Sequence, residues 1–318
     1  MVSTLRLGEY KISKMLKQIL IVFLLFGAVG LGISQNRNLT PDDEKSLMKQ
    51  EADLGMLAYL IINDSMDINR FAAVKAFIPQ LVTALKTKNS FQYPFTQLQS
   101  YISILYPPDS TFRIITWQVQ GEGDFQNFGA IQMNQEALKL YPLIDRSETY
   151  ADVEQKILKP NEWFGAIYYR LMPLTKKKNN AKYVLFGFDN FNPMTRRKVL
   201  DILSFDSDGK PVFGAPVLEY EDGTVKNRMV MEYYSGATTT LNYDVDRKKI
   251  IYDHLITHND KNGAALRVSD GSYEGFEFKR GKLKHIDKVF HLKVEEPPMP
   301  FPVLQDQKGK DVIGRPKG

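Results

Sequence analysis

Two aspartates that could hold a metal ion, Asp206 and Asp208, lie in the segment SFDSDGKPVFG, residues 204–214. A calcium loop of the EF-hand type needs oxygen ligands at positions one, three and five, a Gly at six and a bidentate Glu at twelve. Here Gly209 stands at position four and Val217 at position twelve. Since Asp and Gly tolerate the left-handed backbone conformations of hairpin loops, the segment predicts a turn between two strands.

His254 and His258 are the closest pair of histidines in the chain. On a helix this spacing would put both rings on one face, as in the HExxH zinc motif, but the segment DHLITH lacks the Glu. The preceding KIIYD is typical of a strand, on which the two residues would lie about 13 Å apart, too far to share one zinc ion. We therefore predict no metal site and no cofactor.

The chain contains no Cys. Disulfides, Cys-ligated metal clusters and a Cys nucleophile are therefore excluded. A serine hydrolase is not supported, because no GxSxG motif is present. A carboxylate pair for glycoside hydrolysis stays open, since such residues meet in space and need no fixed spacing in the sequence.

Basic residues gather in segments that we expect to be loops. The candidate binding residues are Lys176, Lys177, Lys178, Arg196, Arg197, Lys198, Arg247, Lys248 and Lys249. If the fold brings several of these clusters to one rim, they would bind an anionic component of the cell envelope. The alternative is that charged turns keep hairpin ends soluble and protect sheet edges.

Aromatic residues, 12% of the chain, recur through the predicted strands. An exposed aromatic surface could stack on sugar rings. The alternative is that these side chains pack across neighbouring strands.

The elements that must position these residues begin with two helices predicted between residues 40 and 88. Thr40 is suited to cap the first helix, with Pro41 at its first position and acidic residues in its first turn. The segment NDS, residues 63–65, separates it from a second amphipathic helix, which we expect Pro79 to kink.

From about residue 111 the pattern changes to the alternation of β-strands. The runs TFRIITWQV and FQNFGAIQM predict a hairpin, and a third helix is predicted over residues 147–158. Short strands separated by Gly-containing turns then continue to about residue 292. We predict an α+β fold, with a short N-terminal helical region packed on a long antiparallel β-meander that forms a sandwich, a barrel or a propeller-like sheet.

The N-terminus predicts a signal peptide. Lys11, Lys14 and Lys17 precede an apolar run, residues 19–33, which is followed by the small Ser34. The run is shorter than the roughly 20 residues of a spanning helix. We therefore predict that residues 1–34, with Met15 as an alternative start, direct export to the periplasm or the extracellular space. The alternative is an uncleaved membrane anchor.

The predicted signal peptide also accounts for most of the basic charge. Residues 1–34 carry +3 of the formal net charge of +5, so the remainder of the chain carries only +2. A protein that binds nucleic acid would need a clustered basic stripe, so we predict no such partner. Beyond the signal we expect a helical region over residues 35–99, an antiparallel β domain over 100–292 and a Pro-rich extended tail over 293–318.

Several segments together resemble a group of exported proteins of the Bacteroidetes, to which no activity is assigned. They are YISILYPPDSTFRIITWQV, FGAIQMN, YVLFGFD, RRKVLDILSFDSDGKPVFGAPV, LNYD and DGSYEGFEF, and they span most of the predicted mature chain. The resemblance implies a location in the cell envelope and supplies no catalytic residues.

No catalytic constellation stands out in the sequence, so we predict a non-catalytic binding or structural component of the cell envelope. Its partner would be an envelope glycan, an anionic envelope component or a protein, with the Pro-rich tail as one docking segment. The alternative is an envelope hydrolase acting on glycan or peptide. A cleft with two close carboxylates, one with a raised pKa, would favour the hydrolase.

Overall fold

The computed structural model describes residues 39–175, 180–259, 263 and 265–290 of the chain. The predicted signal peptide, Lys176, Lys177, Lys178 and the Pro-rich tail lie outside these residues. The chain divides into two compact units. The first unit comprises Met1–Ile104, Ser110–Ile115 and Ile131–Leu140, and the second comprises Leu105–Asp109, Thr116–Ala130 and Tyr141–Gly318.

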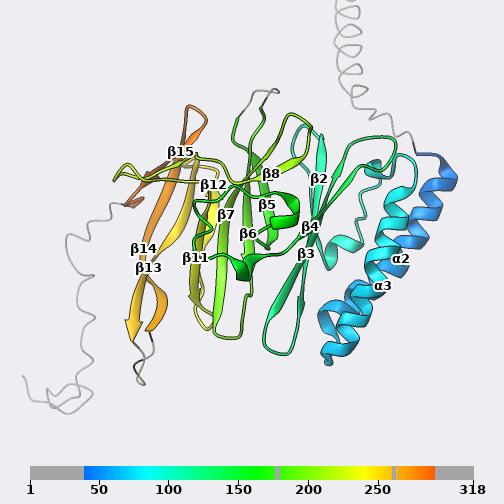
Figure 1. Ribbon diagram of the computed structural model, residues 1–318, viewed down its shortest axis with the longest axis horizontal. Coiled ribbons are helices and arrows are strands. Elements are labelled where there is room, and N and C mark those ends of the chain that lie inside the picture. The colour runs from blue at the N-terminus through cyan, green and yellow to red at the C-terminus, as the bar shows by residue number, and fades with distance from the viewer. Residues whose placement is uncertain (1–38, 176–179, 260–262, 264, 291–318) are drawn as a thin grey trace, which may run out of the picture. The chain divides into compact units, whose positions relative to one another are not determined.

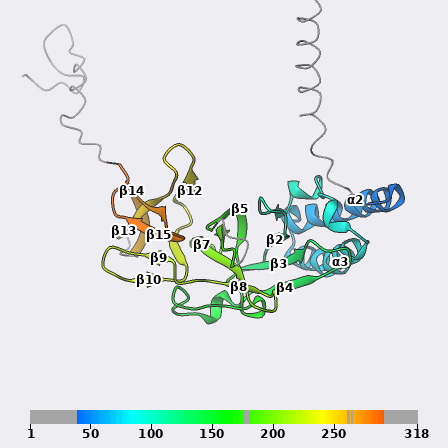
Figure 2. The same cartoon turned by 90° about the horizontal axis from the view of Figure 1, so that it is seen from above.

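Two helices, α2 (Pro41–Asn63) and α3 (Asp67–Lys86), lie side by side in the first unit (Figure 2). The predicted cap is confirmed, because the Thr40 side chain accepts a hydrogen bond from the backbone N–H of Asp43. The predicted break is confirmed as well, and α3 continues through Pro79. In the described residues, no helix is long and apolar enough to cross a membrane.

The core of the first unit is apolar, and the buried charged side chains of Glu51 and Arg113 in it are hydrogen-bonded to the protein. Glu51, 2% exposed, accepts from the hydroxyl of Tyr93 and from two backbone N–H groups. Arg113, which is inaccessible to solvent, donates to Gln132 and to the carbonyls of Tyr93 and Ser90. Such partners offset the cost of removing charge from water. The apolar core includes Leu47, Leu54, Ala58, Ile61, Phe77, Leu81, Ala84 and Leu85.

The rest of the described chain consists of strands joined by turns and short 3-10 helices (Figure 1). The 3-10 helices are η1 (Ser90–Gln92), η2 (Leu98–Ser100), η3 (Ser147–Thr149) and η4 (Pro160–Glu162). The strands are β1 (Ser103–Leu105), β2 (Phe112–Gln120), β3 (Phe125–Met133), β4 (Leu140–Ile144), β5 (Ile167–Pro173), β6 (Tyr183–Asp189), β7 (Thr195–Phe205), β8 (Pro211–Phe213), β9 (Leu218–Glu219), β10 (Val225–Lys226), β11 (Met229–Tyr234), β12 (Leu241–Asp244), β13 (Lys249–Asn259), β14 (Ala265–Lys279) and β15 (Lys282–Ile286).

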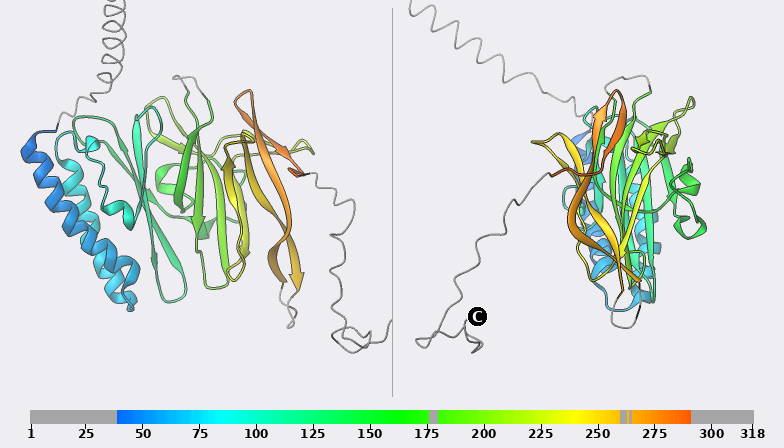
Figure 3. Two further views of the ribbon diagram at one scale, coloured as in Figure 1. Left: turned by 180° about the vertical axis from the view of Figure 1, so that it is seen from behind. Right: turned by 90° about the vertical axis from the view of Figure 1, so that its left-hand side faces the viewer.

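These strands form three sheets, which confirms the predicted α+β class. The sheet orders are β1-β2-β3-β4, β11-β7-β6-β5 with β8 beside β7, and β10-β9-β15-β14-β13-β12. Within the described residues none of the three closes on itself. The pairings described for the last two sheets are antiparallel except that of β15 with β9. The long hairpin of β13 and β14 can be followed in Figure 3.

The last two sheets share one buried core within the second unit. Side chains from β6, β7 and β11 meet side chains from β12, β13, β14 and β15 there. This packing buries the facing sides of the two sheets against each other. The core includes Val184, Phe186, Leu200, Ile202, Met229, Met231, Leu241, Ile250, Tyr252, Phe276 and Leu283.

Residues 204–214 form the predicted hairpin between β7 and β8. Phe205 pairs with Pro211, the first residue of β8. The Asp206 carboxylate accepts hydrogen bonds from the backbone N–H groups of Asp208 and Lys210, and Gly209 has a φ of 72°. Asp206 therefore stabilises the turn itself, and Gly209 supplies the left-handed conformation that the turn requires.

The prediction of a helix over residues 147–158 is wrong. Only η3 forms at its start, and Leu158 instead makes an isolated antiparallel bridge with Phe213. Val153 and Leu158 are buried as expected, but Ile157 is 56% exposed. Two backbone hydrogen bonds between Leu158 and Phe213 replace the bonds that a helix would have made.

Candidate functional site

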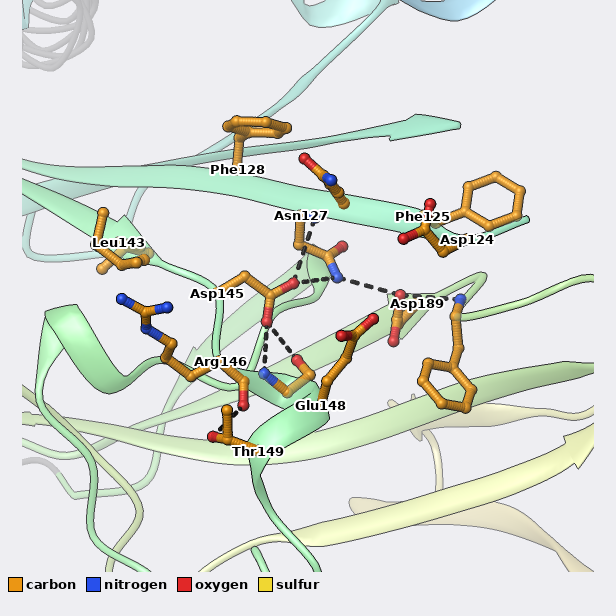
Figure 4. Close-up of a pocket in the computed structure, with 14 residues that line it drawn as sticks. Asp124, Phe125, Asn127, Phe128, Leu143, Asp145, Arg146, Glu148, Thr149 and Asp189 are labelled. Atoms are coloured by element: carbon orange, nitrogen blue, oxygen red, sulfur yellow. Dashed lines mark hydrogen bonds between the residues drawn. The ribbon is translucent and has the colours of Figure 1, made fainter. Parts of the chain in front are cut away.

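A cleft of about 350 Å³ lies in the second unit and is lined mainly by polar and aromatic residues (Figure 4). Its walls come from the segment 124–128 at the start of β3, the segment 143–149 at the end of β4 and in η3, and the turn after β6. We call it the Asp145–Asp189 cleft. Its lining residues are Asp124, Phe125, Gln126, Asn127, Phe128, Leu143, Ile144, Asp145, Arg146, Ser147, Glu148, Thr149, Asp189 and Phe191.

Asn127 joins the two carboxylates of the cleft. Its Nδ2 atom donates to Oδ2 of Asp145 at 2.9 Å and to Oδ1 of Asp189 at 3.1 Å (Figure 4). Because both oxygens lie about 3 Å from one nitrogen, they are at most about 6 Å apart. This upper limit admits the separation of about 5–5.5 Å between the carboxyl groups of retaining glycosidases.

Asp145 organises the loop that follows β4. Its Oδ1 atom accepts from the backbone N–H and the hydroxyl of Ser147 and from the backbone N–H of Gly165. Its Oδ2 atom accepts from both the backbone and the side chain of Asn127. A Cβ at position 165 would lie 2.2 Å from Oδ2 of Asp145, so this close approach requires Gly165.

Asp189 lies at the end of β6 and is only 1% exposed. Its Oδ1 atom accepts from Gln118 at 2.6 Å, from Asn127, and from the backbone N–H of Phe191 at 3.0 Å. Burial raises the pKa of Asp189, while the hydrogen bonds from Asn127 and Phe191 and the charge of Arg197 oppose the increase. The second oxygen, Oδ2, faces Nη1 of Arg197 at 3.7 Å.

Arg197 connects this network to β11. Its Nε atom donates to Oε1 of Glu232 at 2.7 Å, and its guanidinium lies 3.2 Å from the centre of the Phe191 ring. The arginine is thus held by an aromatic ring and two carboxylates, which fixes the turn that carries Asp189 and Phe191.

Aromatic side chains border the polar floor of the cleft. Phe125, Phe128 and Phe191 are each half-buried. Behind Phe128 lies the buried Trp117, with the two rings stacked at 5.6 Å and an interplanar angle of 9°. The Phe128 ring is therefore supported in a fixed orientation.

Charged side chains complete the rim. Asp124, Arg146 and Glu148 are exposed, and Figure 4 shows them around the same opening. Unlike Asp145 and Asp189, they are free to turn toward a ligand in the cleft.

Asp145, Asp189 and Asn127 were not among the residues predicted from the sequence to form a site. No spacing connects them, because they come from three elements that meet only in the folded unit. The only sequence signal is an acidic residue at the end of a buried strand, as at Asp189 in YVLFGFD. That pattern does not distinguish a site from an ordinary turn.

The predicted basic clusters fall in different elements. Arg196, Arg197 and Lys198 belong to β7, so their placement in a loop was wrong. Arg247 and Lys248 lie in the turn between β12 and β13, and Lys249 begins β13 in another sheet.

The described members of these clusters are engaged with neighbouring side chains to different degrees. Lys198 lies over the rings of Tyr169 and Phe188, and burial lowers its pKa. Arg247 pairs with Asp244 at 2.9 Å. Binding of an anionic envelope component by these residues stays a prediction.

His254 and His258 both lie on β13, as predicted. His254 Nδ1 contacts one oxygen of Glu274, and Nε2 of His285 lies 2.9 Å from the other. Burial favours a higher pKa for Glu274, but the hydrogen bonds from His285, His254 and Tyr252 outweigh it and lower the pKa to about 2. The hydrogen bond to Glu274 raises the pKa of His254. In the described part of the chain, no group of three or more His, Asp or Glu residues is arranged to hold a metal ion.

The fold and the cleft together define an α+β, β-rich protein with a polar, aromatic-bordered cavity. No family model matches the chain, and no curated protein sequence matches it. Among solved structures, a crystal structure of a glycosyl hydrolase from Bacteroides ovatus is similar over 59% of this chain, with 9% sequence identity and a TM-score of 0.25. The chain covers 51% of that structure. At this level the similarity assigns neither a fold family nor a function.

Proposed function

We propose that this chain is an exported protein of the cell envelope that binds a glycan in the Asp145–Asp189 cleft. The observation that carries the proposal is the combination of half-exposed Phe faces with the exposed side chains of Asp124, Arg146 and Glu148 around one cavity. Sugars present apolar C–H faces and hydroxyl edges, so aromatic rings and exposed polar groups are complementary to them. The predicted signal peptide supports the export part of the proposal.

Binding is favoured over catalysis by the way the two carboxylates are used. Asp189 is almost inaccessible, and three donors converge on its Oδ1 atom. Both oxygens of Asp145 accept hydrogen bonds from the protein. Groups held in this way stabilise the walls of a cleft, whereas a catalytic acid or nucleophile must reach the substrate.

Glycan hydrolysis in the same cleft is the second candidate. It is favoured by the separation of at most about 6 Å between carboxylate oxygens and by the raised pKa of Asp189. Two close carboxylates, one with a raised pKa, are the arrangement expected of a hydrolase. Asp189 would serve as the acid and Asp145 as the nucleophile, once a ligand had displaced their present donors.

Titration calorimetry with a panel of envelope oligosaccharides tests the proposal. We expect a ligand that binds the purified chain without being cleaved, and a loss of affinity of at least about tenfold in Phe128→Ala, since the ring supplies the stacking face. Tyr273→Ala is the matched control, because it removes a half-buried aromatic ring on β14, away from the cleft.

The products of the same incubations decide between the two candidates. Release of reducing ends that stops in both Asp145→Asn and Asp189→Asn would support the hydrolase. Binding that is unaffected by Phe128→Ala, or the absence of any saccharide ligand, would overturn the glycan proposal.

A further inference from the structure

The charges that line the Asp145–Asp189 cleft are unequal. Arg146 supplies a cation, and the carboxylates that line the same cavity are those of Asp124, Asp145, Glu148 and Asp189. Arg197, behind Asp189, does not correct the balance, because its guanidinium also pairs with Glu232. The cavity therefore has a negative potential, which favours a cationic ligand over an anionic one.

Two of these carboxylates are available to a ligand. Asp124 and Glu148 are exposed, and in Figure 4 the Glu148 side chain points from η3 toward the cleft. In the described part of the chain, neither of them forms a salt bridge with Arg146. Asp145 accepts its hydrogen bonds from the protein and adds fixed negative charge in the wall. Direct contact with a ligand therefore falls to Glu148 and Asp124.

The backbone around the cleft is unsuited to an anion. A backbone anion site needs N–H groups that are free to point at the ligand. Here the N–H groups of Asn127 and Ser147 donate to Asp145, and that of Phe191 donates to Asp189. Backbone carbonyls accept from the N–H groups of Phe125, Arg146 and Thr149. The cleft thus offers acceptors in the main, which suits a ligand that donates hydrogen bonds.

The aromatic border indicates an organic cation. The rings of Phe125, Phe128 and Phe191 line the cleft, and the Phe191 ring already holds the Arg197 guanidinium at 3.2 Å. Aromatic faces attract ammonium groups as well as guanidinium groups. The acidic residues of the described chain, by contrast, are not grouped to hold a metal ion. An amine attached to a ring with an apolar face combines both features that the cleft recognises.

We propose that the glycan bound in this cleft carries a free, protonated amino group, as a glucosamine unit does, and that Glu148 selects it. This inference rests on the proposed glycan function of the cleft. The ammonium group donates to the Glu148 carboxylate, while an apolar face of the sugar stacks on the supported ring of Phe128. An N-acetylated unit carries no charge at this position and loses the charged contact. The cavity, about 350 Å³, lies within the usual size of small-molecule sites.

Two tetrasaccharides that differ only in acetylation test the inference. Titration calorimetry at about pH 6, where an amine is protonated, compares the glucosamine tetramer with the N-acetylglucosamine tetramer on the purified chain. We expect the glucosamine tetramer to bind about tenfold more tightly, because a hydrogen bond to a charged group is worth more than a neutral one. The difference should shrink as salt is added, since Glu148 is exposed to solvent.

Charge variants of the rim identify the residue responsible. Glu148→Gln should remove most of the difference between the two tetramers, because it removes the charge and nearly keeps the shape. Arg146→Gln should increase the difference, because it removes the cation that repels the amine. Glu221→Gln is the matched control, since it removes an exposed carboxylate in the turn between β9 and β10, outside the lining of the cleft. Circular dichroism checks that all three variants keep their fold.

Tetralysine separates a saccharide from a cationic peptide. It offers amino groups without a sugar face, so it should bind at least about tenfold more weakly than the glucosamine tetramer. Phe128→Ala should weaken the glucosamine tetramer and bring its affinity toward that of tetralysine, because the stacking surface is then lost.

Three results would overturn the inference. They are an N-acetylated tetramer that binds as tightly as the glucosamine tetramer, a preference that Glu148→Gln leaves unchanged, and tetralysine that binds as tightly as the glucosamine tetramer. Binding of another saccharide but of neither tetramer would likewise overturn the inference, while the proposed glycan function would stand. The absence of any saccharide ligand would overturn both.

Discussion

Asn127 donates a hydrogen bond of 3.1 Å to Asp189, and the same nitrogen donates to Asp145. The amide thus stands between two carboxylates whose charges would otherwise repel each other across the cleft. Its carbonyl oxygen accepts from Gln118 at 3.1 Å, which fixes the orientation of the amide. Asn127 therefore determines whether the two walls of the cleft stay together.

Asn127→Ala should lower the free energy of unfolding by about 1–3 kcal/mol, because Asp189 loses a donor in a buried position. Urea denaturation of the purified variant measures the change. Gln126→Ala, at the exposed neighbouring position, is the control and should change stability little. Equal stabilities of the two variants would contradict the role assigned to Asn127.

Asp201 and Arg228 form an ion pair that is inaccessible to solvent, with 3.2 Å between Nε and Oδ2. Arg228 also donates to the carbonyls of Val153 and Lys156, in the segment predicted to be a helix. Arg228→Met should cost about 3–5 kcal/mol, since it leaves a buried carboxylate without its cation.

The double variant Asp201→Asn, Arg228→Met separates the pair from the packing around it. It should recover part of the loss seen in Arg228→Met, because no uncompensated charge then remains. A double variant less stable than Arg228→Met alone, measured by the same denaturation, would argue against this explanation.

Local chemistry made the helices and turns predictable. Thr40 and Pro41 mark the start of α2 through capping, and the run of Asp206 to Gly209 marks a turn because its own side chains satisfy the backbone. The runs FRIITWQV and FQNFGAIQM likewise indicate strands without any knowledge of their partners, and the structure buries both faces of β2.

The segments whose structure was predicted wrongly are determined by contacts with residues far away in the sequence. The segment 147–158 has a helical pattern, but its carbonyls are taken by Arg228, more than 70 residues later. Arg197 appeared to be a loop cation, whereas Glu232 and Phe191 hold it inside a strand pair. The Asp145–Asp189 cleft was not predicted from the sequence, because its residues come together only in the tertiary structure.

The contact of Glu274 with His254 and His285 should make stability depend on pH at both ends. The folded pKa of Glu274, about 2, is below the ordinary 4.5, so its contribution is present above pH 4.5 and is lost as pH falls toward 2. The folded pKa of His254 is raised above 6.5, so its contribution is present below pH 6.5 and is lost as pH rises through the folded pKa.

Thermal unfolding from pH 2 to pH 9 measures this profile. His254→Gln should flatten the alkaline side, and Glu274→Gln should flatten both sides. His258→Gln is the control, because His258 is exposed on the same strand. A profile that His254→Gln leaves unchanged would show that the pair does not contribute.

Gly165→Ala adds only a methyl group, but it should both destabilise the protein and weaken ligand binding in the cleft. The new Cβ would lie 2.2 Å from Oδ2 of Asp145 and 2.6 Å from Cβ of Asn127, so one of these residues must move. We expect a loss of stability of about 1–3 kcal/mol from the forced shift, together with weaker binding of any ligand found for the cleft. Gly123→Ala is the matched control, since a Cβ there meets no atom within 4 Å. If both variants bound ligand as the parent chain does, with unchanged unfolding midpoints, Asp145 would not be the residue that fixes the wall of the cleft.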